Sequence, residues 1–154
     1  MRAFLILLSL LLLNPVEAAI ADEESGVVVI VNTANKTDYL SRQIIARFYS
    51  NYKLEWRPGE AVILYDLLPT NPVRKRFSMQ VLERDASRVA ERWAHMKITN
   101  QAINPPMVLK SEWMIIRKVA RQENAIGYVS LRAFKATHAR NVKVIYSIKG
   151  RLPE

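Results

Sequence analysis

Short apolar runs alternate with helical segments along most of the chain, and this alternation constrains the fold more than any other feature. Residues 27–31 form a continuous β-branched run, residues 61–65 and 125–129 are similar runs, and residues 142–148 close the series. Continuous apolar runs are typical of strands that are buried on both faces of a sheet. Strands that alternate with helices build an α/β sheet covered by those helices. The pattern therefore predicts a mixed α/β sheet flanked by helices, with the last strand at an edge.

Four segments between these runs repeat apolar residues with helical spacing. Their predicted apolar faces are Leu40, Ile44, Ile45 and Phe48; Val73, Phe77, Val81 and Leu82; Val89, Trp93 and Met96; and Trp113, Ile116, Val119 and Ala120. Residues with this spacing lie on one side of a helix, which then packs on the core. We therefore expect Phe77 and Trp93 to lie in the core rather than to contact a ligand.

The N-terminal segment has the pattern of a cleavable secretory signal. Arg2 supplies a positive charge, residues 4–13 are apolar apart from Ser9, and Ala18 and Ala21 each offer a small-residue cleavage site. A bilayer span needs about 20 apolar residues, which this run does not reach. The sequence therefore predicts a signal peptide at residues 1–21 and a periplasmic location, with cleavage after Ala21 favoured over cleavage after Ala18.

Removal of residues 1–21 would leave 133 residues (154 minus 21), which suits a single domain at residues 22–154. The formal net charge is +9, and it stays at +9 because Arg2 and Glu17 are lost together. Such a surplus favours anionic partners, and export argues against nucleic acid. The alternative is that most of these cations simply keep the surface solvated. The absence of Cys excludes disulfides, thiolate metal sites and a lipid-anchored lipoprotein.

Residues suited to catalysis or metal binding are sparse. His95 and His138 do not have metal-ligand spacing, and the sequence contains no nucleophile or phosphate-loop motif. The carboxylates of Asp38, Asp66 and Asp85 are far apart in the sequence and suit caps and solvent contacts. The sequence therefore predicts a protein that is not an enzyme and holds no cofactor or metal.

Several ordered segments resemble the phosphate-binding proteins of ABC transporters. The late segment 124–129 (Asn-Ala-Ile-Gly-Tyr-Val) follows Trp93, Thr99 and a helix, and it has the form of a late signature in that family. The run 27–32, the helix at residues 40–50 and Trp56-x-Pro-Gly59 precede it in the expected order. The resemblance covers most of residues 27–129.

This resemblance implies a single-lobe type 2 periplasmic-binding-protein-like domain that corresponds to the second lobe of the full-length proteins. Those proteins hold phosphate between two lobes, so a closing clamp here would need a partner or a homodimer. The implied ligand is phosphate or another small oxyanion, and the implied partner is a membrane transporter or sensor. Two alternatives remain open. One is an envelope interaction or sensor-accessory module that has lost the ligand, and the other is a peripheral protein that binds anionic lipid.

The chain departs from the family where phosphate would bind. Asp66 stands about where the family has an Arg, and residues 67–72 replace its glycine-rich turn. A carboxylate repels phosphate by about 4 kcal/mol for unit charges about 4 Å apart at an effective dielectric near 20. The helix that begins near Thr70 still offers a capping residue, N–H groups and a cation within one turn. We therefore predict that an oxyanion would contact Thr70, Asn71 and Arg74, against the opposing charge of Asp66.

Two further polar residues are candidate ligand contacts. Thr33 follows the first strand, at the carboxyl end where ligands of open α/β sheets usually lie. Thr99 matches a Thr-Gly pair of short relatives, although Asn100 replaces the Gly and puts close backbone approach in doubt. For Gly127 we predict tight sheet packing rather than a role in ligand binding.

Overall fold

Five strands form one mixed sheet in the computed structural model of the chain, which describes residues 26–148. In chain order they are β1 (Val27–Asn32), β2 (Ile63–Leu67), β3 (Met107–Leu109), β4 (Ala125–Ser130) and β5 (Val142–Ile148). Their order across the sheet is β3-β2-β4-β1-β5. Strand β2 pairs in parallel with β3 and β4, whereas β1 pairs antiparallel with β4 and β5. Strands β2 to β5 thus run in one direction and β1 runs in the opposite direction.

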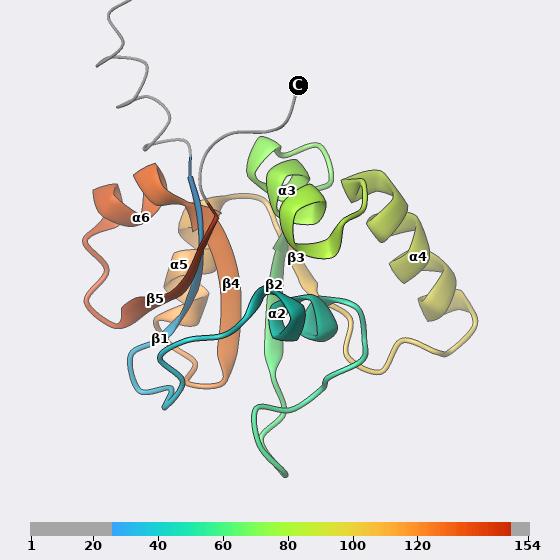
Figure 1. Cartoon of the computed structure of the whole chain (residues 1–154), viewed down its shortest axis with the longest axis horizontal. Coiled ribbons are helices and arrows are strands. Elements are labelled where there is room, and N and C mark those ends of the chain that lie inside the picture. Colours follow the sequence, from blue (N-terminus) through green and yellow to red (C-terminus); the bar gives the residue numbers. More distant parts are fainter. Residues whose placement is uncertain (1–25, 149–154) are drawn as a thin grey trace, which may run out of the picture.

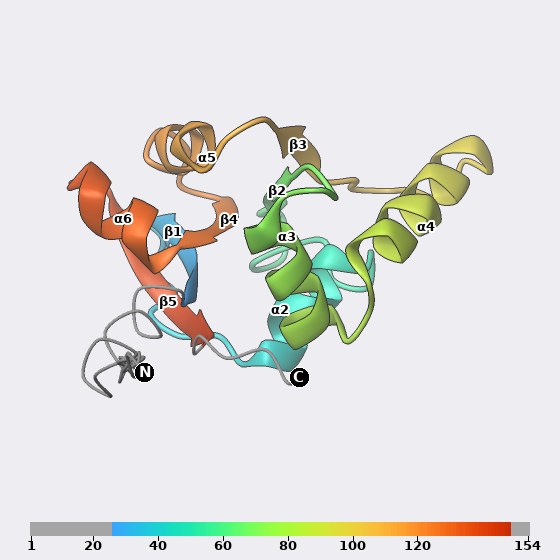
Figure 2. The ribbon, with the colours of Figure 1, turned by 90° about the horizontal axis from the view of Figure 1, so that it is seen from above.

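Helices cover both faces of this sheet. They are α2 (Arg42–Tyr49), α3 (Pro72–Phe77), its π-helical continuation η1 (Ser78–Leu82), α4 (Ala86–Ile98), α5 (Glu112–Val119) and α6 (Leu131–Thr137). Figures 1 and 2 show α5 on one side of the sheet and α2 and α3 on the other. Helix α6 packs against α5, β4 and β1. Within residues 26–148, no helix combines the length and the apolar character that crossing a membrane requires.

The predicted α/β sheet flanked by helices is confirmed, and β5 lies at an edge as expected. Two elements, β3 and α6, were not predicted. Strand β3 has three residues and is mostly exposed, and α6 has no fully buried residue, so neither produces a long apolar pattern. The prediction that Trp113 lies in the buried apolar face of its helix is wrong, because the residue is 53% exposed. The predicted signal peptide lies outside the described residues.

The core lies on both sides of β1. Every residue of β1 is buried, because β4 and β5 flank it and helices cover both faces. Phe77 is fully buried in this core, and Trp93 is buried in a second, smaller cluster with Val89 and Met96. The predicted burial of Phe77 and Trp93 is therefore confirmed, but Trp93 also lines a cavity that is described below.

Three helices begin at one end of the sheet, where the four strands of common direction end. Helix α3 follows β2, α5 follows β3 and α6 follows β4, and the side chains of Asn71, Ser111 and Ser130 cap their first turns. Because β1 runs the other way, Val27 at its start lies beside Ser130 and Ile148 at this same end. In open α/β sheets the carboxyl ends of the parallel strands are where ligands usually bind.

Gly127 lets helix α5 pack closely on the sheet, as predicted. A Cβ atom at this position would overlap Cγ2 of Ile115 and lie 3.4 Å from Cγ2 of Val119, both on α5. Ile115 is fully buried, and the overlapping Cγ2 is attached directly to its Cβ, so it cannot move away without moving the core around it. The glycine is therefore required by contact between layers and not by an unusual backbone angle.

We predict that Gly127→Ala destabilises the protein by about 1 to 3 kcal/mol, the usual cost of overpacking a core. Urea denaturation monitored by tryptophan fluorescence would measure this cost. Ile115→Ala removes the overlapping atom, so adding Gly127→Ala to that variant should cost less than about 1 kcal/mol more. An equal cost in both backgrounds would show that the overlap is not the cause.

Candidate functional site

A buried ion pair lies at the carboxyl end of β2. Nη1 of Arg74 on α3 lies 2.7 Å from Oδ1 and 2.6 Å from Oδ2 of Asp66 on β2. The residues are 2% and 3% exposed, respectively. A charge removed from water in this way is tolerated when it is paired and hydrogen bonded. The Arg74 that was predicted to face a ligand therefore already has an anionic partner within the protein.

Two further donors complete the environment of the Asp66 carboxylate. The hydroxyl group of Tyr128 on β4 donates a short hydrogen bond to Oδ1, and the N–H of Leu67 donates to the same atom at 2.8 Å. Nη1 of Arg74 also lies 3.4 Å from the Tyr128 hydroxyl oxygen. Asp66, Arg74 and Tyr128 thus form one hydrogen-bonded cluster, which we call the Arg74 cluster.

Buried aromatic rings pack against the Tyr128 side of the Arg74 cluster. The Phe77 ring stacks on the Tyr128 ring with centroids 3.8 Å apart and an angle of 1° between the planes. Tyr49 of α2 meets the edge of both rings, at 4.9 Å from Phe77 and 5.9 Å from Tyr128. Its hydroxyl group donates to the carbonyl oxygen of Tyr65 at 2.9 Å. These rings fix the phenol of Tyr128 in the position from which it donates to Asp66.

Local sequence explains why Arg74 points into the protein. Asn71 is the N-cap of α3, and Pro72 occupies the first turn, where its missing N–H costs nothing. The side-chain oxygen of Asn71 accepts from the N–H groups of Val73 at 2.8 Å and Arg74 at 3.4 Å. The cap is thus Asn71 and not Thr70, which is exposed in the preceding turn. The N–H groups expected to cradle an anion are bonded to Asn71.

Burial sets the protonation behaviour of the Arg74 cluster. It raises the pKa of Asp66, and the opposing effects of Arg74, Tyr128 and the Leu67 N–H offset this only in part. Burial also raises the pKa of Tyr128 well above its ordinary value, and the neighbouring Asp66 charge adds to the effect. Burial lowers the pKa of Arg74, but Tyr128 and Asp66 more than compensate, so the guanidinium stays charged. Asp66 is therefore the first member of the cluster to change its charge as the pH falls.

A cavity of about 180 Å³ lies beside the Arg74 cluster, between β2, β3 and α4. Its lining residues are Asp66, Leu67, Pro69, Arg74, Ala90, Trp93, Ala94, Lys97, Pro106 and Val108. Nε of Arg74 is buried and has no hydrogen-bond partner within residues 26–148. Ala94, Lys97 and Val108 are exposed, so the cavity opens to solvent on their side. A buried donor without a partner needs an explanation, and a ligand in the adjoining cavity would supply the missing acceptor.

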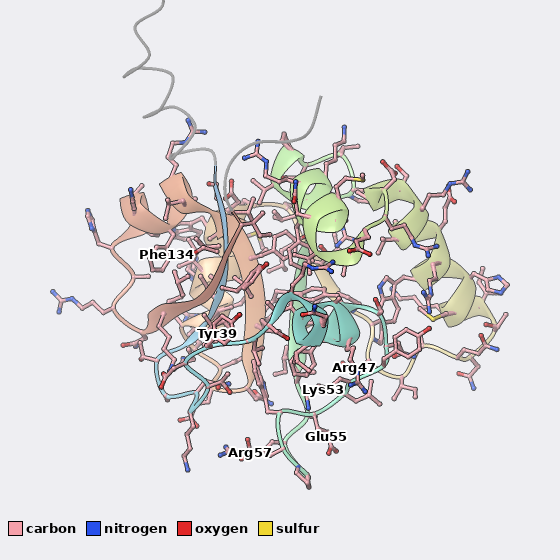
Figure 3. All side chains as sticks on the ribbon, in the orientation of Figure 1. Tyr39, Arg47, Lys53, Glu55, Arg57 and Phe134 are labelled. Atoms are coloured by element: carbon pink, nitrogen blue, oxygen red, sulfur yellow. The ribbon has the colours of Figure 1, made fainter. Side chains whose placement is uncertain are left out.

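A larger cavity of about 610 Å³ lies at the other end of the sheet, with Asn35, Lys36, Arg57 and Glu123 among its lining residues. Figure 3 shows Arg57 on the loop at the end of the molecule opposite to α3. The polar groups of this cavity bond to one another: Arg57 pairs with Glu60 at 2.7 Å, and the Asn35 amide donates to the Glu123 carbonyl. We consider the smaller cavity the better candidate, because its buried cation retains an unused donor.

The structure does not bring Thr33 and Thr99 to the Arg74 cluster. Thr33 follows β1, and because β1 runs antiparallel, its carboxyl end lies at the opposite end of the sheet from Thr70. The expectation that Thr33 lies at the same end of the sheet as the ligand holds only if β1 is parallel to β2, and it is not. Thr99 is the C-cap of α4, and its hydroxyl group donates to the carbonyl oxygen of His95 at 3.0 Å. A helix C-terminus carries partial negative charge and is a poor place for an anion.

The sequence analysis did not identify Tyr128 or Lys97 as site residues. It treated Asp66 as a charge that opposes the ligand, whereas Asp66 is the ion-pair partner of Arg74. Tyr128 was predicted only as part of a buried strand. The signal that indicates a further role is its hydroxyl group, because a buried phenol usually has a hydrogen-bond partner. Lys97 lies seven positions after Ala90 on α4, and helical spacing places both on the face that lines the cavity. Among residues 26–148, no three His, Asp or Glu side chains are grouped so that they could hold a metal ion.

Comparison with solved structures shows what this fold is similar to. An ABC-type phosphate transport receptor from Vibrio cholerae superposes with a TM-score of 0.54 at 17% identity, over 78% of this chain and 45% of that chain. PstS from Borrelia burgdorferi superposes with a TM-score of 0.58 at 13% identity, over 92% of this chain and 56% of that chain. The chain therefore spans about half the length of these solved proteins. No family model and no curated protein matches the sequence.

The predicted single-lobe resemblance to phosphate transport proteins is confirmed at the level of fold. This chain spans 45% and 56% of the two matched structures, and its mixed five-stranded sheet has a periplasmic-binding-protein-like fold. The protein thus has a solute-binding-like fold of one lobe. At sequence identities of 17% and 13%, the comparison shows a similar fold and does not identify a ligand.

We predict that breaking the Arg74 cluster destabilises the protein strongly. Asp66→Asn leaves a buried guanidinium without its counter-charge, and the cost should be about 3 to 5 kcal/mol. Chemical denaturation would measure it, with Glu60→Gln as the control, because that change removes an exposed ion pair and should cost less than about 1 kcal/mol.

The double variant Asp66→Leu/Arg74→Met separates the stability effect of an unpaired buried charge from the effect of side-chain packing. It leaves no unpaired buried charge, so it should be more stable than Asp66→Asn. If Asp66→Asn is as stable as the control, the ion pair does not hold the helical layer in place.

Proposed function

We propose that this protein is a small solute-binding-like protein that binds a small oxyanion in the cavity beside the Arg74 cluster. The observation that carries the proposal is the buried guanidinium of Arg74, which lines the cavity while its Nε has no partner among the described residues. The solute-binding-like fold and the net charge of +9 support it. The position of the cavity at the carboxyl end of β2 agrees with where such sheets usually bind ligands.

The charges around the cavity favour a single negative charge in the ligand. Arg74 and Lys97 contribute two positive charges and Asp66 one negative charge, which leaves a formal surplus of one. Lys97 has no ion-pair partner among the described residues. An oxyanion would therefore lie between Lys97 and Arg74 Nε, away from Asp66. Thr70 and Asn71 flank this position in sequence and would contribute contacts after rearrangement of the α3 cap.

A membrane transporter or sensor is the partner that we propose for the loaded protein. One of the solved proteins with a similar fold is an ABC-type phosphate transport receptor, and this chain spans 45% of its length. A second copy in a homodimer, or a partner protein, would supply the missing half of a clamp.

We predict measurable binding of inorganic sulfate or phosphate by titration calorimetry, with a gain in thermal stability. A ligand at a hundredfold excess over Kd stabilises the folded state by about 2.7 kcal/mol. Arg74→Lys retains the charge but loses Nε, so it should weaken binding by about 1.5 to 3 kcal/mol, the range for a hydrogen bond to a charged group. Circular dichroism would verify that this variant is folded. A lack of response to sulfate, phosphate and simple carboxylates would rule out the proposed function.

The same titration should depend on pH through Asp66. Burial raises the pKa of Asp66, and its protonation removes the negative charge beside the ligand. Binding of an anion and protonation of Asp66 therefore favour each other, so sulfate affinity should rise as the pH falls from 7 toward that raised pKa. Sulfate is the suitable probe because its own charge does not change over this range. Affinity that falls with pH would place the ligand away from Asp66.

The second candidate function is an envelope interaction module that keeps the fold without the ligand. One observation favours it: several apolar side chains are exposed on the β2–α3 loop, on β3 and in the first turn of α5, namely Leu68, Met107, Val108, Trp113 and Met114. Exposed apolar groups of this kind occur at protein interfaces. Failure of every anion in the titration would favour this function.

We also propose that the protein is exported to the periplasm. The proposal rests on the charge, apolar run and small residues at positions 1–21. N-terminal sequencing of protein from the periplasmic fraction should begin at Asp22 or within three residues before it. Protein that retains Met1 and stays in the membrane fraction would contradict this prediction.

A further inference from the structure

We infer that the ligand of the cavity beside the Arg74 cluster is a monovalent carboxylate with a small apolar body, rather than phosphate. This inference rests on the proposed function and narrows its ligand class. Most residues that line the cavity are apolar, and the charged groups are Asp66, Arg74 and Lys97. A ligand that matches this lining has one charged end and one apolar end.

The cavity has room for a ring or a short branched chain. Its volume is about 180 Å³. In another protein an apolar cavity of about 150 Å³ binds benzene, so a body of that size fits here. Bare phosphate would leave the apolar part of the lining without a partner.

Helix α4 provides the apolar wall. Ala90, Trp93, Ala94 and Lys97 have the spacing of one helical face, and all four line the cavity. The two alanines leave space that larger side chains would fill, and Trp93 provides a flat apolar surface. Figure 2 shows α4 standing off the sheet, with its connection to β3. The apolar body of a ligand would contact Trp93 and the alanines, and its carboxylate would lie near Lys97.

The available donors also argue against phosphate. A phosphate group taken out of water needs hydrogen bonds to most of its oxygen atoms. The first N–H groups of α3 are already bonded to Asn71, and Nη1 of Arg74 is bonded to Asp66. Nε of Arg74 has no partner among the described residues, and the Lys97 ammonium group forms no ion pair with them, so a single carboxylate has donors available. The nearby Asp66 charge disfavours a dianion more than a monoanion.

Titration calorimetry of the purified protein at pH 7 would test this inference with three probes: benzoate, inorganic phosphate and benzyl alcohol. Benzoate has the charge and the ring, phosphate has the charge alone, and benzyl alcohol has the ring alone. We expect benzoate to bind at least about tenfold more tightly than either of the other two, because benzyl alcohol loses a charge-assisted hydrogen bond and phosphate loses the burial of the apolar ring.

Two variants locate the ligand. Lys97→Met should weaken benzoate binding by about three- to tenfold, and Lys118→Met, an exposed lysine of α5, is the matched control. Ala94→Leu fills the cavity from an exposed helix position that tolerates Leu, so it should weaken benzoate binding at least about tenfold. Ala136→Leu on α6 is its control. If either site variant binds benzoate as tightly as its control does, the cavity is not the site.

The remaining outcomes separate this inference from the proposed function. If phosphate binds and benzoate does not, the protein is an oxyanion binder but the carboxylate inference is wrong. If benzyl alcohol binds as tightly as benzoate, the cavity selects apolar groups without regard to charge and the inference is also wrong. If none of the three binds, both the inference and the proposed function fail.

Discussion

The buried ion pair between Arg74 and Asp66 is the interaction on which the rest of the structure depends. Each charge is stable in the interior because the other is within hydrogen-bonding distance, and Tyr128 and the Leu67 N–H complete the set. The partners come from β2, α3 and β4, so satisfying their charges fixes the helical layer against the sheet. The stacking of Phe77 on Tyr128 adds packing to the same junction. Loss of either member of the ion pair would leave the other charge buried without a partner, which is strongly unfavourable. The pair therefore holds α3 against β2.

The reversed direction of β1 is the second constraint. It lies between β4 and β5 and runs against both, so Val27 and Ile148 are neighbours at the end of the sheet where α3, α5 and α6 begin. Both ends of the described part of the chain therefore lie at the end where the Arg74 cluster is located. A partner protein that binds next to Val27 or Ile148 would be close to the proposed site, whereas Thr33 lies at the opposite end of the sheet. Topology thus decides which polar residues can act together.

The sequence predicted the α/β sheet well because its signals are local. The β-branched runs and the helical spacing around Ile45 or Val89 arise from burial within single elements. The site was predicted less well because it depends on contacts between elements. Asp66 and Arg74 were both recognised as charged groups near a ligand, but nothing in the local sequence shows that they pair with each other. The error for Thr33 has the same origin, since strand direction is set by pairing with β4 and β5.

A cation that is already paired changes what a binding site of this kind can select. Arg74 cannot offer its full charge to a ligand while Asp66 is ionised, so attraction for a highly charged anion is reduced. Burial of apolar surface then provides a larger part of the binding free energy, at about 25 cal/mol for each Å² of apolar surface removed from water. That surface comes from Trp93 and its neighbours on α4, a helix outside the main core. Selectivity in this fold would therefore be set by the shape of the α4 wall and tuned by charge, because the Arg74 guanidinium is first of all a structural group.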